Sequence, residues 1–169
     1  MKTLYIMCGI PGSGKTHYAK NHLIPHAHYS YISRDEIRFD LVGENEDYFS
    51  KEKEVYRLFV AEIIHALKNP LNDCVVADAT HINWASRKKL INAISKELPL
   101  DNRLNIVPIV IRTKLATCLK RNHQRKGRAV VPDEVIEKMY HRFLDPTWDP
   151  FNYDGIMYVK GDIDDSWRL

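Results

Sequence analysis

The chain has 169 residues, of which 44% are hydrophobic, and a formal net charge of +3. These values are typical of one folded domain, which we expect to span residues 1–169. A charge this small does not distinguish a nucleic-acid binder from an average enzyme. No segment approaches the ~20 apolar residues that a membrane-spanning helix needs, so we expect a soluble protein.

Cysteine and histidine usage argues against disulfide bonds and zinc. Cys8, Cys74 and Cys118 are widely spaced and form no CxxC pair, which predicts reduced thiols and a cytoplasmic location. The histidines include no HExxH pairing.

The amino-terminal half alternates apolar runs with helical patterns. Leu4–Cys8 is a continuous apolar run ended by Gly9, as expected of a central parallel strand, and a helix is expected over Lys15–His22. Tyr29–Ile32 predicts a second strand. The S-x-x-E capping box at Ser33–Glu36 predicts a helix that begins near Arg34.

The remaining chain continues this alternation. We expect strands at Cys74–Ala77, at Leu104–Ile111, where Pro108 indicates an edge or a bulge, and at Gly155–Val159. Amphipathic patterns predict helices at Asp47–Lys68, Trp84–Leu98, Leu115–Asn122 and Pro132–Leu144.

Strands that alternate with helices predict an α/β fold with a central, mainly parallel sheet between two helical layers. The polar segments 9–16, 33–38 and 78–80 each follow a predicted strand, so we expect them to meet at one edge of the sheet. The acidic tail, 161–169, is expected to be partly disordered.

The segment Gly9–Thr16 reads Gly-Ile-Pro-Gly-Ser-Gly-Lys-Thr, the Gly-x-x-x-x-Gly-Lys-Thr spacing of a P-loop. Its backbone N–H groups and the following helix would hold phosphate, Lys15 would reach the β and γ oxygens, and the Thr16 hydroxyl would bind Mg²⁺. The sequence therefore predicts ATP and Mg²⁺ as ligands. The nucleotide-binding set is Gly9, Pro11, Gly12, Ser13, Gly14, Lys15 and Thr16. A glycine-rich turn that merely starts a helix is the alternative.

Three polar positions after the second and third strands are candidates for the acceptor site. Asp35 could accept the proton of an attacking hydroxyl, and Arg38 shares its helix face. Asp78 stands at the Walker-B position, where it could hold Mg²⁺ or the acceptor, and Thr80 is a weaker candidate. Asp35 with Arg38 could instead be a surface ion pair, and Asp78 a helix cap.

Seven Lys or Arg residues and no Asp or Glu lie between Arg112 and Arg128. We interpret residues 114–132 as a mobile lid with a hinge at Gly127. Arg121 and Arg125 lie on one helix face and could reach the nucleotide together, although a solvated basic face is also consistent with this pattern.

Four of these motifs, in this order, resemble polynucleotide 5′-kinases: Gly9–Thr16, Ile32–Arg38, Asp78–Asn83 and the segment from Lys120 to Pro132. The resemblance covers residues 1–144 and implies transfer of the ATP γ-phosphate to the 5′-hydroxyl end of DNA or RNA. It implies that Asp35 is the general base, that Arg38 binds the acceptor's own phosphate and that Arg125 stabilises the transition state. The lid segment is one residue longer than in the phage enzymes of this family, so Arg128 competes with Arg125.

Two other functions remain open from the residues alone. A P-loop kinase of a nucleoside, sugar or other small alcohol would share the nucleotide site and differ in the acceptor pocket. A nucleotide-dependent switch would hydrolyse ATP without a phosphorylated product.

Overall fold

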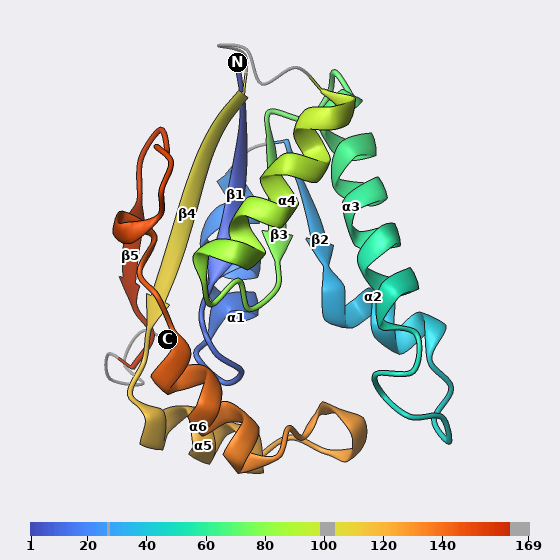
Figure 1. The fold of residues 1–169 in the computed structure, drawn as a ribbon, viewed down its shortest axis with the longest axis vertical. Helices are drawn as coiled ribbons and strands as arrows, with labels where there is room; N and C mark the ends of the chain where they lie inside the picture. Colours follow the sequence, from blue (N-terminus) through green and yellow to red (C-terminus); the bar gives the residue numbers. More distant parts are fainter. Residues whose placement is uncertain (27, 99–103, 163–169) are drawn as a thin grey trace.

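The structure, a computed structural model, describes residues 1–26, 28–98 and 104–162. Its strands are β1 (Lys2–Cys8), β2 (Tyr29–Ser33), β3 (Cys74–Asp78), β4 (Leu104–Arg112) and β5 (Met157–Lys160). They form one sheet in the order β2-β3-β1-β4-β5, and every neighbouring pair is parallel. Figure 1 shows this sheet with all carboxyl ends at the same edge. The predicted α/β fold is therefore confirmed.

The helices connect these strands as expected, with shifted ends. They are α1 (Lys15–Tyr18), α2 (Arg34–Leu41), α3 (Glu52–Lys68), α4 (Trp84–Glu97), α5 (Leu115–His123) and α6 (Asp133–Arg142). After α1 the chain stays helical in a π-turn, Ala19–Leu23, and a 3₁₀ turn, Ile24–His26. Two further 3₁₀ turns lie at Gly127–Ala129 and Pro146–Trp148.

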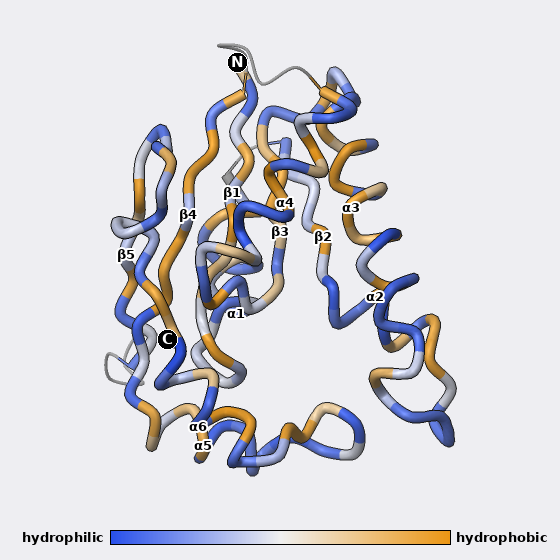
Figure 2. Tube along the Cα trace, viewed as in Figure 1, coloured by the Kyte–Doolittle hydropathy of each residue, from blue (hydrophilic) through white to orange (hydrophobic). Residues whose placement is uncertain are grey.

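Two hydrophobic cores make the sheet the middle of three layers. On one face, Leu4 and Ile6 of β1 pack with Phe59 of α3 and Leu90 of α4. On the other face, Met7 packs with the turn that follows α1. Figure 2 shows the hydrophobic positions that run along β4, as expected of a strand covered on both faces.

Pro108 lies inside β4, where its missing N–H is tolerated. β4 pairs with β1 from Leu104 to Val110, but its pairing with β5 begins at Ile109. Ile106, two residues earlier on the same side, turns its N–H and carbonyl toward Asp154. Pro108 therefore faces the side where β5 has not yet begun, which is the edge position that its ring favours.

The largest error in a predicted helix start lies before α3. The helix expected from Asp47 begins at Glu52, because the Asp47 carboxylate accepts the N–H of Phe49 in a local turn. This turn leaves the side chain of Phe49 61% exposed. In the tail, the N–H of Gly161 donates to the carbonyl of Arg112 in β4, and the carboxylate of Asp162 accepts the N–H of Lys114. Residues 163–169 lie outside the described residues.

Within the described part of the chain, none of the helices is long and apolar enough to cross a bilayer.

Candidate active site

The P-loop adopts a conformation that its glycines permit. Gly12 has φ +81° and Gly14 has φ +100°, both in the left-handed region. A Cβ on Gly12 would lie 2.5 Å from the carbonyl oxygen of Cys118 in α5, so α5 packs directly against the loop. The N–H of Gly9 donates to the carbonyl of Thr80 at 2.9 Å, which ties the loop to the segment after β3.

Lys15 and Thr16 extend from the start of α1 toward the end of β3. The Lys15 ammonium donates to the carbonyl of Ile10 at 3.1 Å. Burial lowers the pKa of Lys15, and the negative charges of Asp78 and Asp35 oppose that change. The Thr16 hydroxyl donates to Oδ2 of Asp78 at 2.8 Å, and the Tyr31 hydroxyl donates to the same oxygen at 2.5 Å.

These residues fit a magnesium nucleotide. Thr16 and Asp78 bring together two hard oxygen ligands, the type that Mg²⁺ prefers. The hydroxyl of Ser13 is buried, and the described residues give it no hydrogen-bond partner. Together with the positive-φ glycines, this loop is the kind of backbone cradle that holds phosphate oxygens.

On the opposite side, α2 presents a carboxylate held by a buried arginine. Arg38 is 6% exposed, and its NH1 donates to Oδ1 of Asp35 at 2.5 Å. Glu52, from α3, accepts from Nε and NH2 of Arg38 at 3.0 and 2.9 Å, and the Tyr48 hydroxyl lies 3.3 Å from NH1. Arg34 also pairs with Glu52. Asp35 and Arg38 thus form an ion pair in which the arginine side chain is 7% exposed and the carboxylate side chain is 67% exposed.

The charges in this cluster are mutually stabilised. Burial alone would lower the pKa of Arg38, but hydrogen bonds with Glu52 and Tyr48 raise it above its ordinary value. Burial would raise the pKa of Glu52, but Arg38 and Arg34 hold it below the ordinary value. Burial and the Asp35 charge raise the pKa of Tyr48. Arg38 and Glu52 are therefore charged at neutral pH, and they fix the orientation of Asp35.

The two arginines that the sequence predicts to reach the nucleotide have different surroundings. Arg121 donates to the carbonyls of Gly12 and Ser13 at 3.2 and 3.3 Å and to that of Gly161 at 2.7 Å. Arg125 is exposed, and NH1 reaches the Ala129 carbonyl at 3.5 Å, the limit for a hydrogen bond.

Arg128 contacts α2 and the residue that follows it. Its guanidinium donates to the carbonyls of Val42 and Phe39, at and just before the end of α2, and lies 5.1 Å from the Phe39 ring. Asn122 closes the base of this loop, since its side-chain amide accepts the Val131 N–H at 3.0 Å and donates to the Val131 carbonyl at 2.6 Å.

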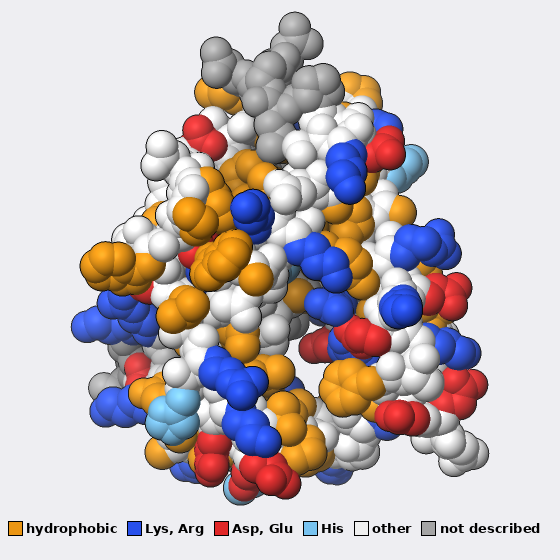
Figure 3. All heavy atoms as spheres, in the orientation of Figure 1, with side chains coloured by type: hydrophobic (Ala, Val, Ile, Leu, Met, Phe, Trp, Pro, Cys, Tyr) orange, Lys and Arg blue, Asp and Glu red, His pale blue; other side chains and the backbone are white. Residues whose placement is uncertain are grey.

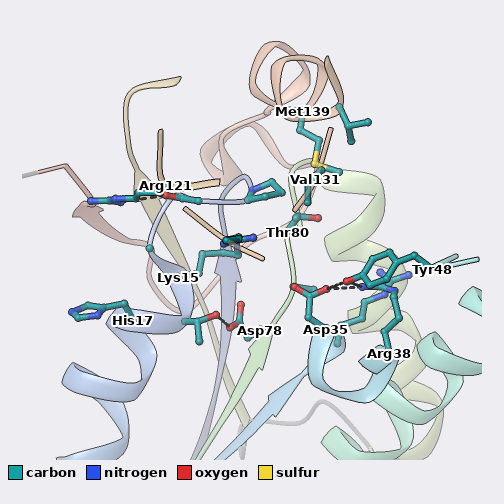
Figure 4. A pocket seen from close by; sticks show the side chains of 18 of the residues that line it. Lys15, His17, Asp35, Arg38, Tyr48, Asp78, Thr80, Arg121, Val131 and Met139 are labelled. Atoms are coloured by element: carbon teal, nitrogen blue, oxygen red, sulfur yellow. Dashed lines mark hydrogen bonds and ion pairs between the residues drawn. The ribbon is translucent and has the colours of Figure 1, made fainter. Parts of the chain in front are cut away.

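The candidate residues surround one cavity of about 630 Å³ at the carboxyl edge of the sheet. Figure 3 shows the molecule hollowed at this place, and Figure 4 shows Lys15 and Asp78 on one side of the cavity and Asp35 with Arg38 and Tyr48 on the other. All the predicted site residues line this cavity except Gly9 and Ser13. Arg128, the competitor of Arg125, does not line it. The cavity thus extends from the P-loop to α2, and we name these ends, after the roles predicted from the sequence, the phosphate end and the acceptor end.

Sequence reasoning missed several residues that hold this site in place. Glu52, Tyr48 and Tyr31 contact the candidates from distant parts of the chain. Buried Arg87 forms a two-bond ion pair with Asp149 at 2.6 and 2.7 Å and donates to the His81 carbonyl at 2.7 Å. No local motif marks these residues, although Glu52 and Arg87 interrupt otherwise apolar helical patterns.

His81 supports the segment after β3. Its φ is +42°, and its ring Nδ1 lies 2.8 Å from the Met7 carbonyl. Burial lowers its pKa to about 4, so the ring is neutral at pH 7. His81 therefore helps to position Thr80, whose carbonyl holds the P-loop.

Comparison with known proteins agrees with this geometry. A family model described as an AAA domain, AAA_33, matches residues 4–146. The chain belongs to this family.

Two curated relatives match most of the chain. One is a protein of Autographa californica nuclear polyhedrosis virus, named as a candidate bifunctional polynucleotide kinase/RNA ligase. It is 27% identical over 157 residues, which are 85% of this chain and 21% of that protein. The L-seryl-tRNA(Sec) kinase of Methanococcus maripaludis is 32% identical over 155 residues, 86% of this chain and 56% of that protein. The chain therefore spans about a fifth of the first relative and just over half of the second.

Solved structures share the fold of this AAA_33 member. A fungal RNA kinase matches with a TM-score of 0.67 and 16% identity, over 96% of this chain and 76% of that one. A gluconokinase from Sinorhizobium meliloti 1021 matches with a TM-score of 0.60 and 17% identity, over 98% and 86%. The predicted P-loop kinase class and the predicted likeness to polynucleotide kinases are confirmed.

Proposed function

We propose that this chain is an ATP-dependent polynucleotide 5′-hydroxyl kinase that requires Mg²⁺. The observation that carries the proposal is the Asp35–Arg38 pair, which faces the P-loop across one cavity and joins a carboxylate to an arginine. A hydroxyl acceptor needs the carboxylate, and an acceptor that already carries a phosphate is suited to the arginine. The viral relative is named for this activity, which supports the proposal.

In the proposed reaction, Asp35 accepts the proton of the 5′-hydroxyl as its oxygen forms a bond to the γ-phosphorus. The bond between the γ-phosphorus and the bridging β,γ-oxygen breaks, and ADP leaves. Lys15 and Arg125 stabilise negative charge on the transferred group from two sides. Arg121 connects the lid to the P-loop carbonyls. A bound Mg²⁺, held through Thr16 and Asp78, would neutralise phosphate charge.

The structure limits how Arg38 can act. Three of its nitrogen atoms already donate to Glu52, Asp35 and Tyr48. An acceptor phosphate must therefore use the remaining N–H or compete with Glu52. We infer that Arg38 both positions Asp35 and contributes positive charge to the acceptor end of the cavity.

A kinase of another alcohol is the second candidate. The archaeal relative is named for an L-seryl-tRNA, and the Sinorhizobium neighbour for gluconate. The nucleotide site would be the same for these acceptors.

Three statements stay predictions: the cytoplasmic location, a single domain over residues 1–169 and the roles of the individual site residues.

The test is incubation with γ-labelled ATP and a panel of acceptors: 5′-hydroxyl DNA and RNA, nucleoside 3′-phosphates, seryl-tRNA, gluconate and simple nucleosides. We expect label in the 5′-hydroxyl nucleic acids and, more weakly, in nucleoside 3′-phosphates. Label confined to gluconate or a nucleoside would support the second candidate. Release of labelled phosphate without any labelled acceptor would support a nucleotide switch.

A further inference from the structure

Positively charged side chains leave the acceptor end of the cavity and continue over α3 and α4. We define the basic track as Arg34, Lys88 and Lys89. Arg34 lines the cavity at the start of α2, and its guanidinium lies 5.2 Å from the ring of Tyr56 on α3. The ammonium of Lys89, on α4, lies 4.2 Å from the same ring. Arg34 and Lys89 are therefore neighbours that share one aromatic ring.

Lys88 extends the track along α4. Its ammonium lies 5.7 Å from the ring of Trp84, which is 42% exposed. Figure 3 shows Lys and Arg side chains gathered on this face beside the hollow, in the region where Figure 1 places α3 and α4. The track thus starts inside the site and reaches the open surface.

The track keeps most of its positive charge. Arg34 shares Glu52 with Arg38, so one carboxylate faces two guanidinium groups. Within the described ranges, neither Lys88 nor Lys89 forms an ion pair, and both side chains are exposed. The two ammonium groups rest on ring faces, an arrangement that restricts the lysines while leaving their N–H groups available to an anion.

We propose that the basic track binds the sugar–phosphate backbone of a single-stranded acceptor, beyond the nucleotide whose 5′-hydroxyl reacts. This inference rests on the proposed function and adds the direction in which the strand leaves the site. Cations spaced over a surface, with the rings of partly buried Tyr56 and exposed Trp84 beside them, match the arrangement by which proteins hold single strands without reading their sequence. The strand passes Arg34 first and then Lys89 and Lys88.

The track predicts a gain in acceptor use with acceptor length. A nucleoside 3′-phosphate reaches the cavity alone, whereas an oligonucleotide places further phosphates on the lysines. Each phosphate that a lysine neutralises releases counterions. For a single strand, the slope of log kcat/KM against log salt concentration therefore becomes more negative by ~0.7 per contact.

The test compares wild type with K88A/K89A on 5′-hydroxyl acceptors of one, two, three, six and twelve nucleotides at two salt concentrations. In the wild type we expect kcat/KM to rise with length, and in K88A/K89A we expect most of that rise to be lost, by about 5- to 20-fold for the hexanucleotide at low salt. Use of the nucleoside 3′-phosphate and the KM for ATP should stay unchanged. Lys96→Ala, an exposed lysine about two turns further along α4, is the matched control and should behave like wild type.

The track would be overturned by a wild-type enzyme whose kcat/KM does not depend on acceptor length, or by a K88A/K89A variant that keeps the full gain. Equal losses at every length, including the nucleoside 3′-phosphate, would also contradict it, because they would indicate a general defect. Failure of the wild type to phosphorylate any 5′-hydroxyl nucleic acid would instead refute the proposed function itself.

Discussion

Replacement of Arg125 by alanine tests the lid most sharply, because Arg128 three residues later provides a matched control. Arg125 lines the cavity and is held by one marginal contact with Ala129, so its guanidinium is available to the transferred phosphate. Loss of one pre-placed donor to transition-state charge costs ~2.7 to 4 kcal/mol, a fall in kcat of ~10²- to 10³-fold. We expect kcat and kcat/KM to fall together.

Arg128→Ala removes a different set of contacts. It loses one cation–π contact, worth ~0.5 to 1 kcal/mol, and hydrogen bonding to α2, worth ~0.5 to 1.5 kcal/mol net. If the whole of this loss weakens lid closure, kcat/KM falls by no more than about 70-fold.

The assay for both variants is steady-state kinetics with a 5′-hydroxyl hexanucleotide at saturating ATP, beside thermal unfolding to verify the fold. We expect Arg128→Ala to raise the acceptor KM and to leave kcat within a few-fold of wild type. A catalytically normal Arg125→Ala beside an inactive Arg128→Ala would refute the reasoning, since it would assign the transition-state contact to the arginine that this structure places on α2.

Three further predictions follow from the same site. Lys15→Ala and Asp35→Ala should each lower phosphoryl transfer by ~10²-fold or more while the melting temperature stays near that of wild type, and normal turnover by a folded Asp35→Ala protein would exclude Asp35 as the base. Arg38→Ala should lower kcat/KM most for acceptors with a 3′-phosphate, and equal losses with and without that phosphate would leave Arg38 only the role of positioning Asp35. His81 has a folded-state pKa of about 4, below its unfolded value, so the unfolded chain binds more protons between these two pKa values and stability rises with pH there. Wild type should therefore gain more unfolding free energy between pH 4.5 and pH 7 than His81→Asn does, by up to ~3 kcal/mol in urea unfolding. Asparagine is chosen because it tolerates the positive φ of this position. Equal gains in the two proteins would contradict a buried neutral ring.

The sequence was sufficient to predict the parts of the site that follow strand ends. Apolar runs of strand length and the glycine spacing placed Gly9–Thr16, Asp35 and Asp78 at one edge of a parallel sheet, because parallel strands bring their carboxyl ends together. The spacing also predicted that Asp35 and Arg38 share a helix face, and the structure joins them in an ion pair.

The partners of these residues were not predictable from local patterns. Glu52 contacts Arg38 only because α3 packs beside α2, and that contact depends on the tertiary fold rather than on spacing. The same holds for Arg87, whose partner Asp149 is 62 residues away. For Arg128 the sequence left its orientation open, and the contact with α2 depends on how the loop closed by Asn122 bends.

The central claim is that the acceptor atom is the 5′-hydroxyl of a polynucleotide. Mass spectrometry of a 5′-hydroxyl hexanucleotide after incubation with ATP and Mg²⁺ measures this directly, with digestion to locate the added group and Asp35→Ala as the control. The account predicts a gain of one phosphoryl group, confined to the 5′-terminal nucleotide and missing in the control. ADP formation without any mass gain in the oligonucleotide, or a phosphoryl group at any other position, would contradict it.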